Sequence, residues 1–231
     1  MIATDTKQRI LDVAEEMFAD QGFGGTSLRS IIAAAEVNLA AVHYHFRSKE
    51  ALLEAVVVRR LEPLNRERLE LLDEYERQAG KWGPSVEQIL EAFLAPPIHF
   101  IRTTPEGSLY GKLLGRMHSE PGALFAAIAK KHFVHVLHRF QTALRRALPE
   151  LPAGDLFWRL HFTIGAMAHT LGRSDLLEVM SGGLCKSTDP KTAIPQLIDF
   201  LSAGFRASAS RRSRKPARPS REGRNHSEKR S

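Results

Sequence analysis

The residues of this chain best suited to bind a partner lie close together, between positions 26 and 49. The spacing of their apolar side chains predicts two short helices joined by a tight turn, the second over Leu39 to His45. Thr26 or Ser27 is placed to cap the first helix, and Asn38 to cap the second. This arrangement is a helix-turn-helix, a motif that lays its second helix in the major groove of duplex DNA.

The outer face of the second helix supports a binding role. Val42 and Phe46 lie four residues apart and are expected to face inward, which leaves an apolar and aromatic set on the outside. Lys49, at the start of the next helix, is poorly matched to the helix dipole, and a DNA phosphate would resolve that mismatch. Tyr44 and His45 also fit a second interpretation, in which they only pack within the small domain. The predicted DNA-binding residues are Thr26, Ser27, Arg29, Asn38, Leu39, Ala40, Ala41, His43, Tyr44, His45 and Lys49.

Length and composition narrow the class of protein. A chain of 231 residues with 43% hydrophobic content has room for a small module and a larger one, each with a core. The single cysteine, Cys185, excludes a disulfide framework and a multi-cysteine zinc site. The longest uncharged apolar stretch, residues 160–172, is too short to cross a bilayer, and the N-terminus has no signal-peptide pattern. These features predict a cytoplasmic protein that has no membrane partner.

The net charge of +7 is confined to the C-terminal end. Ten of the 33 Lys and Arg residues but only two of the 26 Asp and Glu lie from Arg206 onward, so the rest of the chain is nearly neutral. The segment 207–231 is rich in Ser, Arg and Pro and predicts a disordered basic tail. It is either simply solvated or attracted to DNA phosphates regardless of sequence.

The pattern along the rest of the chain is helical, and nothing predicts a strand. A first helix starts at Asp5 or Thr6 and stops at Gly22, and a long helix from 49 to about 75 is interrupted at Pro63. Further helices are expected at 85–102, 106–117, 121–148, 153–173 and 190–207. The predicted fold class is all-α.

The segment from Thr26 to Leu53 resembles the N-terminal signature of TetR-family transcriptional regulators, with the likeness extending over roughly residues 6–55. Residues 156–162 and 200–205 are similar to the C-terminal domain of the fatty-acid-responsive members. The resemblance implies a homodimeric helical repressor that binds a palindromic operator in double-stranded DNA and is released by a small apolar effector, fatty acyl being one class. It also implies three parts: a three-helix helix-turn-helix domain (1–55), a helical ligand-binding and dimerisation domain (56–206) and the basic tail (207–231).

Three positions depart from the family pattern. Glu36 stands where the family usually has a turn glycine, so a non-glycine must adopt a left-handed backbone at a cost of about 1 kcal/mol. His43 replaces a phosphate-contacting tyrosine, and it still has an N–H to donate. Leu39 replaces a base-reading lysine. Because an alkyl group packs on a thymine methyl and cannot hydrogen-bond guanine, a bias toward A·T pairs is expected there.

The resemblance also suggests which residues line a ligand cavity and which form the dimer interface. The ligand-binding candidates, which are equally well explained as core, are Phe93, Phe100, Leu113, Met117, Phe133, Trp158 and Phe162. The interface candidates lie on helices from about 155 to 171 and from 192 to 205 and pair with their two-fold copies in a four-helix bundle. They are Gly165, Ala168, Ile194, Leu197, Ile198 and Leu201. Their apolar stripe could instead be covered within one protomer.

The sequence gives no support for catalysis, a cofactor or a metal. It has no nucleophile-elbow motif, no phosphate-binding glycine loop and no paired carboxylates in a cleft-like context. Three histidines at positions 132, 135 and 138 do not form a metal site by spacing. His132 and His135 would lie on one helix face, whereas His138 is rotated away, and no acidic or cysteine partner is nearby in sequence. The alternative to a DNA-binding regulator is a helical small-molecule-binding or scaffold protein whose helix-turn-helix serves packing alone.

Overall fold

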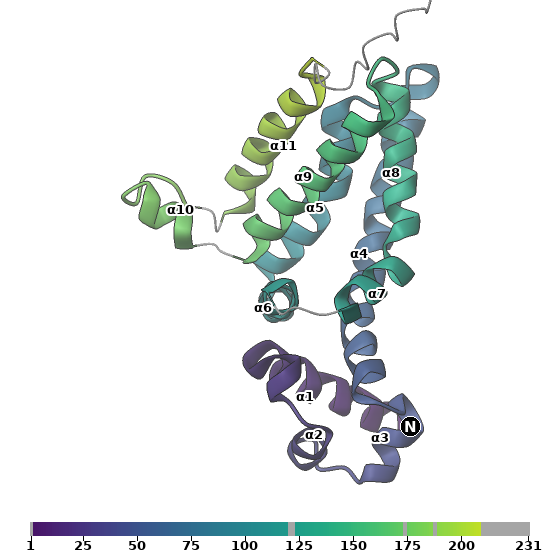
Figure 1. Cartoon of the computed structure of the whole chain (residues 1–231), viewed down its shortest axis with the longest axis vertical. Coiled ribbons are helices and arrows are strands. Elements are labelled where there is room, and N and C mark those ends of the chain that lie inside the picture. The colour runs from purple at the N-terminus through teal and green to yellow at the C-terminus, as the bar shows by residue number, and fades with distance from the viewer. Residues whose placement is uncertain (1, 120–122, 173–174, 187–188, 209–231) are drawn as a thin grey trace, which may run out of the picture.

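The computed structural model describes residues 2–119, 123–172, 175–186 and 189–208. The described ranges contain helices and no strand, which confirms the all-α prediction (Figure 1). Within them, no helix is both long and apolar enough to cross a membrane. Nearly all of the predicted basic tail lies outside the described residues.

Three helices form the small N-terminal domain: α1 (Ile2–Gly25), α2 (Leu28–Ala34) and α3 (Leu39–Phe46). The predicted stop in α1 is confirmed in its backbone, because Gly22 leaves the helical conformation with φ 75°. Ile10 and Phe18 of α1, Ile31 of α2 and Val42 of α3 are buried in a common core. That core fixes the angle between α2 and α3.

Helix α4 (Lys49–Ala79) belongs to both halves of the molecule. Its first turns bury Leu52 and Leu53 with the small domain, and its later turns bury Leu64 and Leu72 in the larger one (Figure 1). The predicted interruption at Pro63 is wrong, since the helix runs through that residue. The domain boundary predicted at residue 55 therefore falls inside one continuous helix.

The larger domain contains the remaining helices. They are η1 (Gly80–Trp82), α5 (Val86–Thr103), α6 (Pro105–Ser119), α7 (Ala123–His132), α8 (Val134–Ala147), α9 (Ala153–Gly172), α10 (Asp175–Met180) and α11 (Pro190–Arg206). Helix α5 lies at the centre and packs against α4, α6, α8, α9 and α11. The long amphipathic run of α5 explains this position, because it buries eleven of its side chains.

Two expectations about these helices are wrong. The predicted helix 121–148 is broken at Phe133, whose backbone (φ −123°, ψ −23°) separates α7 from α8. The Phe133 ring packs against Phe93 at 5.9 Å between centroids, an arrangement that sequence periodicity does not reveal. The short helix α10 lies in a segment where no helix was expected.

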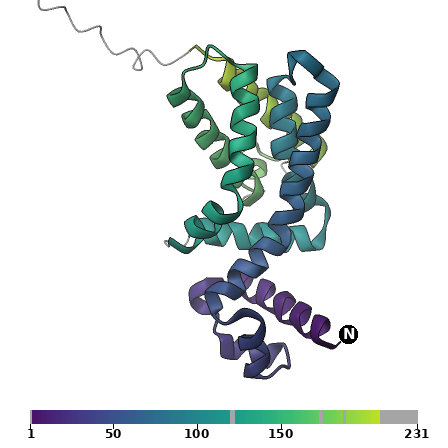
Figure 2. The same ribbon diagram turned by 90° about the vertical axis from the view of Figure 1, so that its right-hand side faces the viewer.

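Helix α6 crosses the junction between the small domain and the rest of the molecule (Figure 2). It reaches α1 through Arg116, which donates from Nε to Ala19 O at 2.8 Å and from Nη2 to Asp20 O at 2.6 Å. Lys112 forms an ion pair with Asp20. The start of α6 approaches α5 so closely that a Cβ built on Gly107 would lie 1.9 Å from Phe100 O.

Replacing Gly107 by alanine is therefore expected to force α5 and α6 apart. Because the obstructing atom is a backbone oxygen, Gly107→Ala should lower the free energy of unfolding by about 1–3 kcal/mol, measured by urea denaturation. Gly154→Ala is the matched control, since a Cβ there meets nothing within 4 Å. Equal stability of the two variants would contradict the close crossing.

Candidate nucleic-acid interface

Helix α3 lies at the end of the molecule away from the larger domain (Figure 1). Val42 and Phe46 are buried, as predicted, and four of the predicted contact residues on the other face are exposed. Those four are Leu39, Ala40, His43 and Tyr44. Tyr44 is 82% exposed and Leu39 is 54% exposed, so both are accessible to a partner.

The caps that orient α2 and α3 are formed as the sequence predicts. Ser27 caps α2 in a reciprocal capping box with Ser30. The Asn38 side chain accepts a hydrogen bond from Ala41 N at 2.8 Å. Ser27, Asn38 and the Arg29 side chain are exposed on the same small domain. Ala41 and His45 are half-buried, and the His45 ring packs edge-on to Tyr44 at 5.0 Å.

Thr26 is a correction to the predicted set. Its side chain is buried, and its hydroxyl donates to Gly22 O at 2.8 Å and to Met17 O at 3.1 Å. These bonds hold Thr26 against the last turns of α1, on both sides of the backbone break at Gly22. Thr26 therefore stabilises the small domain and presents no side chain to DNA.

Lys49 has a structural role that the sequence did not reveal. Its ammonium donates to Phe23 O and Thr26 O, each at 2.7 Å, and lies 4.1 Å from the centroid of the Phe23 ring. The predicted mismatch between the Lys49 charge and the helix dipole is compensated inside the protein, because the two carbonyl oxygens bind the ammonium group. Its contact with phosphate remains a prediction, and Tyr44 is the better placed residue for that contact.

The turn between α2 and α3 confirms the expectation for Glu36. This residue has φ 51°, in the left-handed region that favours glycine. Arg47, between α3 and α4, has φ 63° and was not anticipated. A residue with a strained backbone therefore lies on each side of α3, Glu36 before it and Arg47 after it. These two residues fix the direction of the helix.

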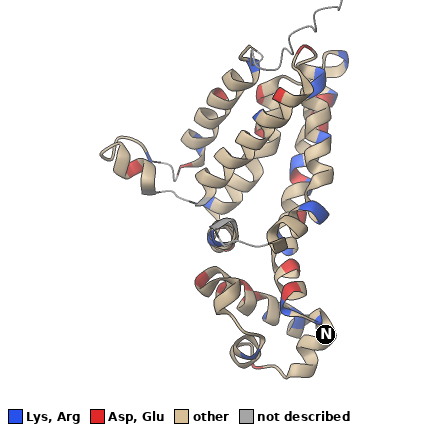
Figure 3. Ribbon diagram, viewed as in Figure 1, with Lys and Arg blue, Asp and Glu red and all other residues tan. Residues whose placement is uncertain are grey.

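The exposed face of α3 carries no Lys, Arg, Asp or Glu (Figure 3). Contacts made by this helix thus depend on shape, apolar packing and single hydrogen bonds rather than on a strong positive field. Arg29 on α2 supplies a nearby cation. Such a surface suits recognition of base edges in a DNA groove, with a few side chains around the helix binding the phosphates.

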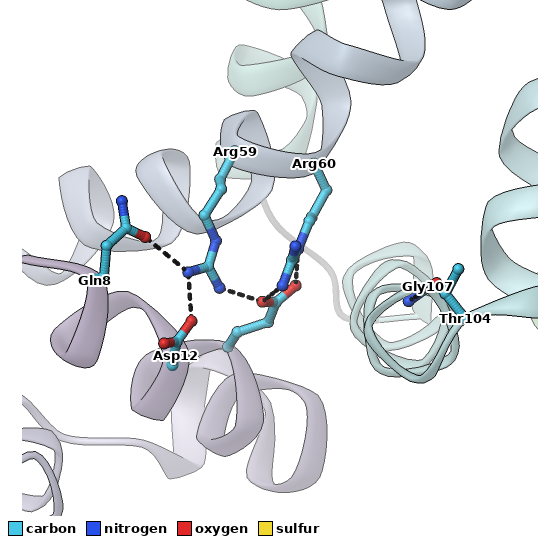
Figure 4. Close-up of polar contacts among 7 residues, drawn as sticks. Gln8, Asp12, Arg59, Arg60, Thr104 and Gly107 are labelled. Atoms are coloured by element: carbon cyan, nitrogen blue, oxygen red, sulfur yellow. Dashed lines mark hydrogen bonds and ion pairs between the residues drawn. The ribbon is translucent and has the colours of Figure 1, made fainter.

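A buried carboxylate joins the small domain to α4 (Figure 4). Glu15 of α1 accepts from Arg60 Nε at 3.1 Å and from Arg60 Nη2 at 2.9 Å, and it also pairs with Arg59. Arg59 additionally contacts Asp12 at 2.5 Å and Gln8 at 3.4 Å. The hydrogen bonds that Arg60 donates to Glu15 raise the pKa of Arg60 above its ordinary value. We call this set of residues the Glu15 clamp.

The structure places the predicted ligand-binding residues in different surroundings. Phe93, Leu113 and Met117 are buried in the core, and Phe133 packs on Phe93. Phe100 lines a cleft of about 350 Å³ together with Leu64, Pro96 and His99 among others.

Trp158 and Phe162 are wrong as cavity residues. They lie on the outer face of α9 and are 62% and 60% exposed. The reason is helical phase, because the inward face of α9 is occupied by Leu156, Leu160 and Thr163.

Three of the predicted dimer residues are also corrected. Ile194, Ile198 and Leu201 are buried within the protomer, where α11 packs on α5. The apolar stripe of α11 is thus covered by α5, as the alternative interpretation held. Gly165 is exposed, and Ala168 and Leu197 are half-buried.

A different surface, which sequence reasoning missed, is exposed on the same two helices. We call it the aromatic patch, and it consists of Phe157, Trp158 and Phe162 on α9 and Phe200 on α11. The rings of Trp158 and Phe162 stack at 5.7 Å between centroids. The four-residue spacing of Trp158 and Phe162, out of phase with Leu156 and Leu160, is the signal that identifies this face in the sequence.

Comparison with protein families agrees with this architecture. A family model described as bacterial regulatory proteins, tetR family, matches residues 10–56. A second, described as tetracyclin repressor-like, C-terminal domain, matches residues 91–204. The chain belongs to the TetR family. The two matched segments correspond to the helix-turn-helix domain and to most of the larger helical domain.

Individual relatives match over shorter segments. UidR of Escherichia coli (strain K12) is 36% identical over 56 residues, which are 24% of this chain and 29% of UidR. SrpR of Pseudomonas putida is 42% identical over 62 residues, which are 27% of this chain and 29% of SrpR. Both are described as HTH-type transcriptional regulators. The chain thus spans less than a third of the length of each.

Solved structures share the fold over most of the chain. The transcriptional regulator FadR from Bacillus subtilis, in complex with stearoyl-CoA, has a TM-score of 0.64 and 14% identity, covering 85% of this chain and 98% of that one. GusR of Salmonella enterica has a TM-score of 0.55 and 20% identity, covering 88% of this chain and 96% of that one. At these identities the likeness shows the fold alone.

The left-handed backbone at Glu36 leads to a prediction for stability. Glu36→Gly removes the Cβ that strains the turn and should raise the free energy of unfolding by up to about 1 kcal/mol. Glu36→Ala is the control, because it removes the same charge and keeps the Cβ. Thermal denaturation distinguishes the two. If alanine stabilised the protein as much as glycine, charge rather than strain would be the cause.

Proposed function

We propose that this protein is a DNA-binding transcriptional regulator, a dimeric repressor that acts in the cytoplasm on a palindromic operator and is released by a small molecule. The observation that carries the proposal is the exposed face of α3, where Leu39 and Tyr44 project from a firmly capped helix at the end of the molecule. An exposed apolar and aromatic face on a helix-turn-helix is the surface that this motif presents to DNA. Membership of the TetR family supports the same function.

In this proposal α3 enters the major groove. Tyr44 and His43 donate hydrogen bonds to phosphates, while Ser27 and Arg29 hold the backbone from α2. Leu39 and Ala40 face base edges, where Leu39 packs on a thymine methyl. The Asn38 side chain stays on its cap, and Ala41 and His45 support the helix from its half-buried side.

The dimer in this proposal forms through the aromatic patch rather than through the buried stripe of α11. An exposed cluster of large aromatic side chains is typical of a protein interface. Gly165 lies on the same exposed side of α9 and allows a partner helix to approach closely. Two copies of α9 and α11 then make a four-helix bundle whose two-fold axis places two α3 helices on one operator.

The effector is proposed to be amphipathic, with an apolar body and a polar head, a fatty acyl compound being one class. FadR, which shares the fold, was crystallised with stearoyl-CoA, and the long acyl chain of that ligand is an apolar body of this kind. Release follows only if the effector prefers a state in which the two α3 helices are wrongly spaced. Two sets of contacts provide the physical link between the effector site and α3. The Glu15 clamp joins α4 to the small domain, and the contacts of α6 with α1 join the larger domain to it.

DNA binding is tested by gel shift with the DNA upstream of the protein's own gene, followed by variants of α3. Tyr44→Phe removes one hydroxyl and should weaken binding to all sequences alike, by about tenfold or more for a lost bond to a phosphate. Leu39→Ala should instead change the preference at one base pair, by about 1–3 kcal/mol. Fluorescence anisotropy on operator variants measures both effects.

Two outcomes of these titrations would contradict the docking model. One is an unchanged affinity of Tyr44→Phe, and the other is an unchanged base preference of Leu39→Ala. A protein that forms no sequence-preferring complex at all would favour the helical scaffold or small-molecule-binding alternative.

The dimer is tested by sedimentation of Phe162→Glu, which places a charge in the centre of the aromatic patch and should give monomers. Trp82→Glu is the matched control, since Trp82 is an exposed aromatic residue outside the patch and its variant should remain a dimer. Circular dichroism confirms that both variants are folded. A folded Phe162→Glu dimer would exclude this interface.

A further inference from the structure

Arg68 of α4 is a buried cation with no acidic contact. Its side chain is 2% exposed. The guanidinium donates only to neutral acceptors: from Nε to Phe93 O at 2.8 Å, from Nη1 to Asn65 Oδ1 at 2.9 Å and from Nη2 to Met167 Sδ at 3.5 Å. Among the ion pairs of the described residues, none includes Arg68. A buried charge without a counter-ion is costly, and it favours binding of an anion.

The surroundings of Arg68 are aromatic. Its guanidinium carbon lies 5.0 Å from the centroid of the Phe93 ring and 5.2 Å from that of Phe133. Burial lowers the pKa of Arg68 to about 10, so the group is still positively charged at neutral pH. Phe133 is the residue at which α7 and α8 separate, so the cation lies close to the break between these helices.

A cleft of about 340 Å³ lined by residues of α4, α7 and the start of α8 shares one residue, Asn65, with the hydrogen-bond partners of this cation. Its wall includes Asn65, whose oxygen accepts from Arg68 and whose Nδ2 donates to His132 O at 3.1 Å. Asn65 is itself buried, so a single amide separates the cleft from the guanidinium. The remaining lining residues are Glu62, Arg66, Leu69, Lys131, His132 and His135.

The charges around the cleft favour an anion. Arg66 and Lys131 are cationic, and Glu62 is the one acidic residue of the lining. Figure 3 shows the basic positions on α7 next to α4. The volume lies at the lower end of the range for small-molecule sites, which suits a compact organic acid.

We propose that this cleft binds the effector as a free organic carboxylate, whose oxygens replace the Asn65 amide on Arg68 and whose apolar body lies against Leu69. This inference rests on the proposed function in one respect, namely that the protein responds to an effector at all. It narrows the effector to compounds with an ionised carboxylate, and it excludes thioesters, which have none.

The same cleft has a direct connection to the DNA-binding end of α4. Lys131 and His132, on its rim, both contact Glu54 Oε1 at 2.6 Å. Glu54 lies on α4 beside Leu52 and Leu53, which are buried with the small domain. A carboxylate that displaces the Asn65 amide from Arg68 also breaks the hydrogen bond from Asn65 Nδ2 to His132 O, and His132 is one of the two residues that contact Glu54. Binding of the carboxylate therefore loosens the hold of α7 on the segment of α4 that carries the helix-turn-helix.

Calorimetric titration of the full chain with octanoate, benzoate and phenylacetate tests the site without DNA. Each is compared with its uncharged alcohol: 1-octanol, benzyl alcohol or 2-phenylethanol. A charge-assisted bond to a buried guanidinium corresponds to about ten- to one-hundredfold in affinity, so at least one acid should exceed its alcohol by that factor. If no acid does so, or if octanoyl-CoA binds more tightly than octanoate, the inference is overturned.

Three variants locate the anion. Arg68→Met keeps the length of the side chain and should abolish the preference for the acid, whereas Arg145→Met, at an exposed position of α8 outside the cleft lining, should change it by less than about threefold. Asn65→Asp is isosteric and supplies an internal counter-ion, so it should also abolish acid binding, and it keeps the test decisive if Arg68→Met fails to fold. Wild-type acid binding by Asn65→Asp would overturn the inference.

Failure of the ligand-free protein to bind any operator would instead refute the proposed function and leave the binding result unaffected.

Discussion

The structure depends on one buried carboxylate. Glu15 lies in α1 at the boundary of the small domain, and its two oxygens are occupied by guanidinium groups of Arg59 and Arg60 from α4. Removing one partner from a buried ion pair of this kind costs about 3–5 kcal/mol, because the other charge is left uncompensated. The position of the helix-turn-helix relative to α4 is therefore held by a directional electrostatic contact as well as by apolar packing.

This constraint explains how a signal in the larger domain can reach α3. Helix α4 is continuous from the small domain to the core of the larger one, so a change along its length is transmitted without a flexible linker. Helix α6 makes a second connection through Arg116 and Asp20. The cation at Arg68 and the carboxylate of Glu54 lie on the same α4, and the cleft lining includes one hydrogen-bond partner of each, Asn65 and His132. An effector that changes one contact of α4 therefore also changes the free energies of its other contacts, including those with the small domain.

The local features of the DNA-binding domain could be predicted from the sequence, because caps and turns depend on neighbouring residues. The Asn38 cap and the left-handed Glu36 are examples. Features that depend on distant partners were not predictable in the same way. The Lys49 ammonium is bound by carbonyls more than twenty positions away, Ile198 is covered by α5 rather than by a second copy, and the break at Phe133 follows from packing on a different helix. Periodicity identifies an apolar face and does not say what covers it.

The central claim is that two copies of α3 read a two-fold symmetric DNA sequence. Selection of binding sites by the purified protein from random duplex DNA tests it most directly, because no operator needs to be known beforehand. The account predicts enrichment of an inverted repeat whose half-site centres are about one helical turn of DNA, or a multiple of it, apart. Enrichment of no sequence, or of a single unrepeated motif, would contradict it.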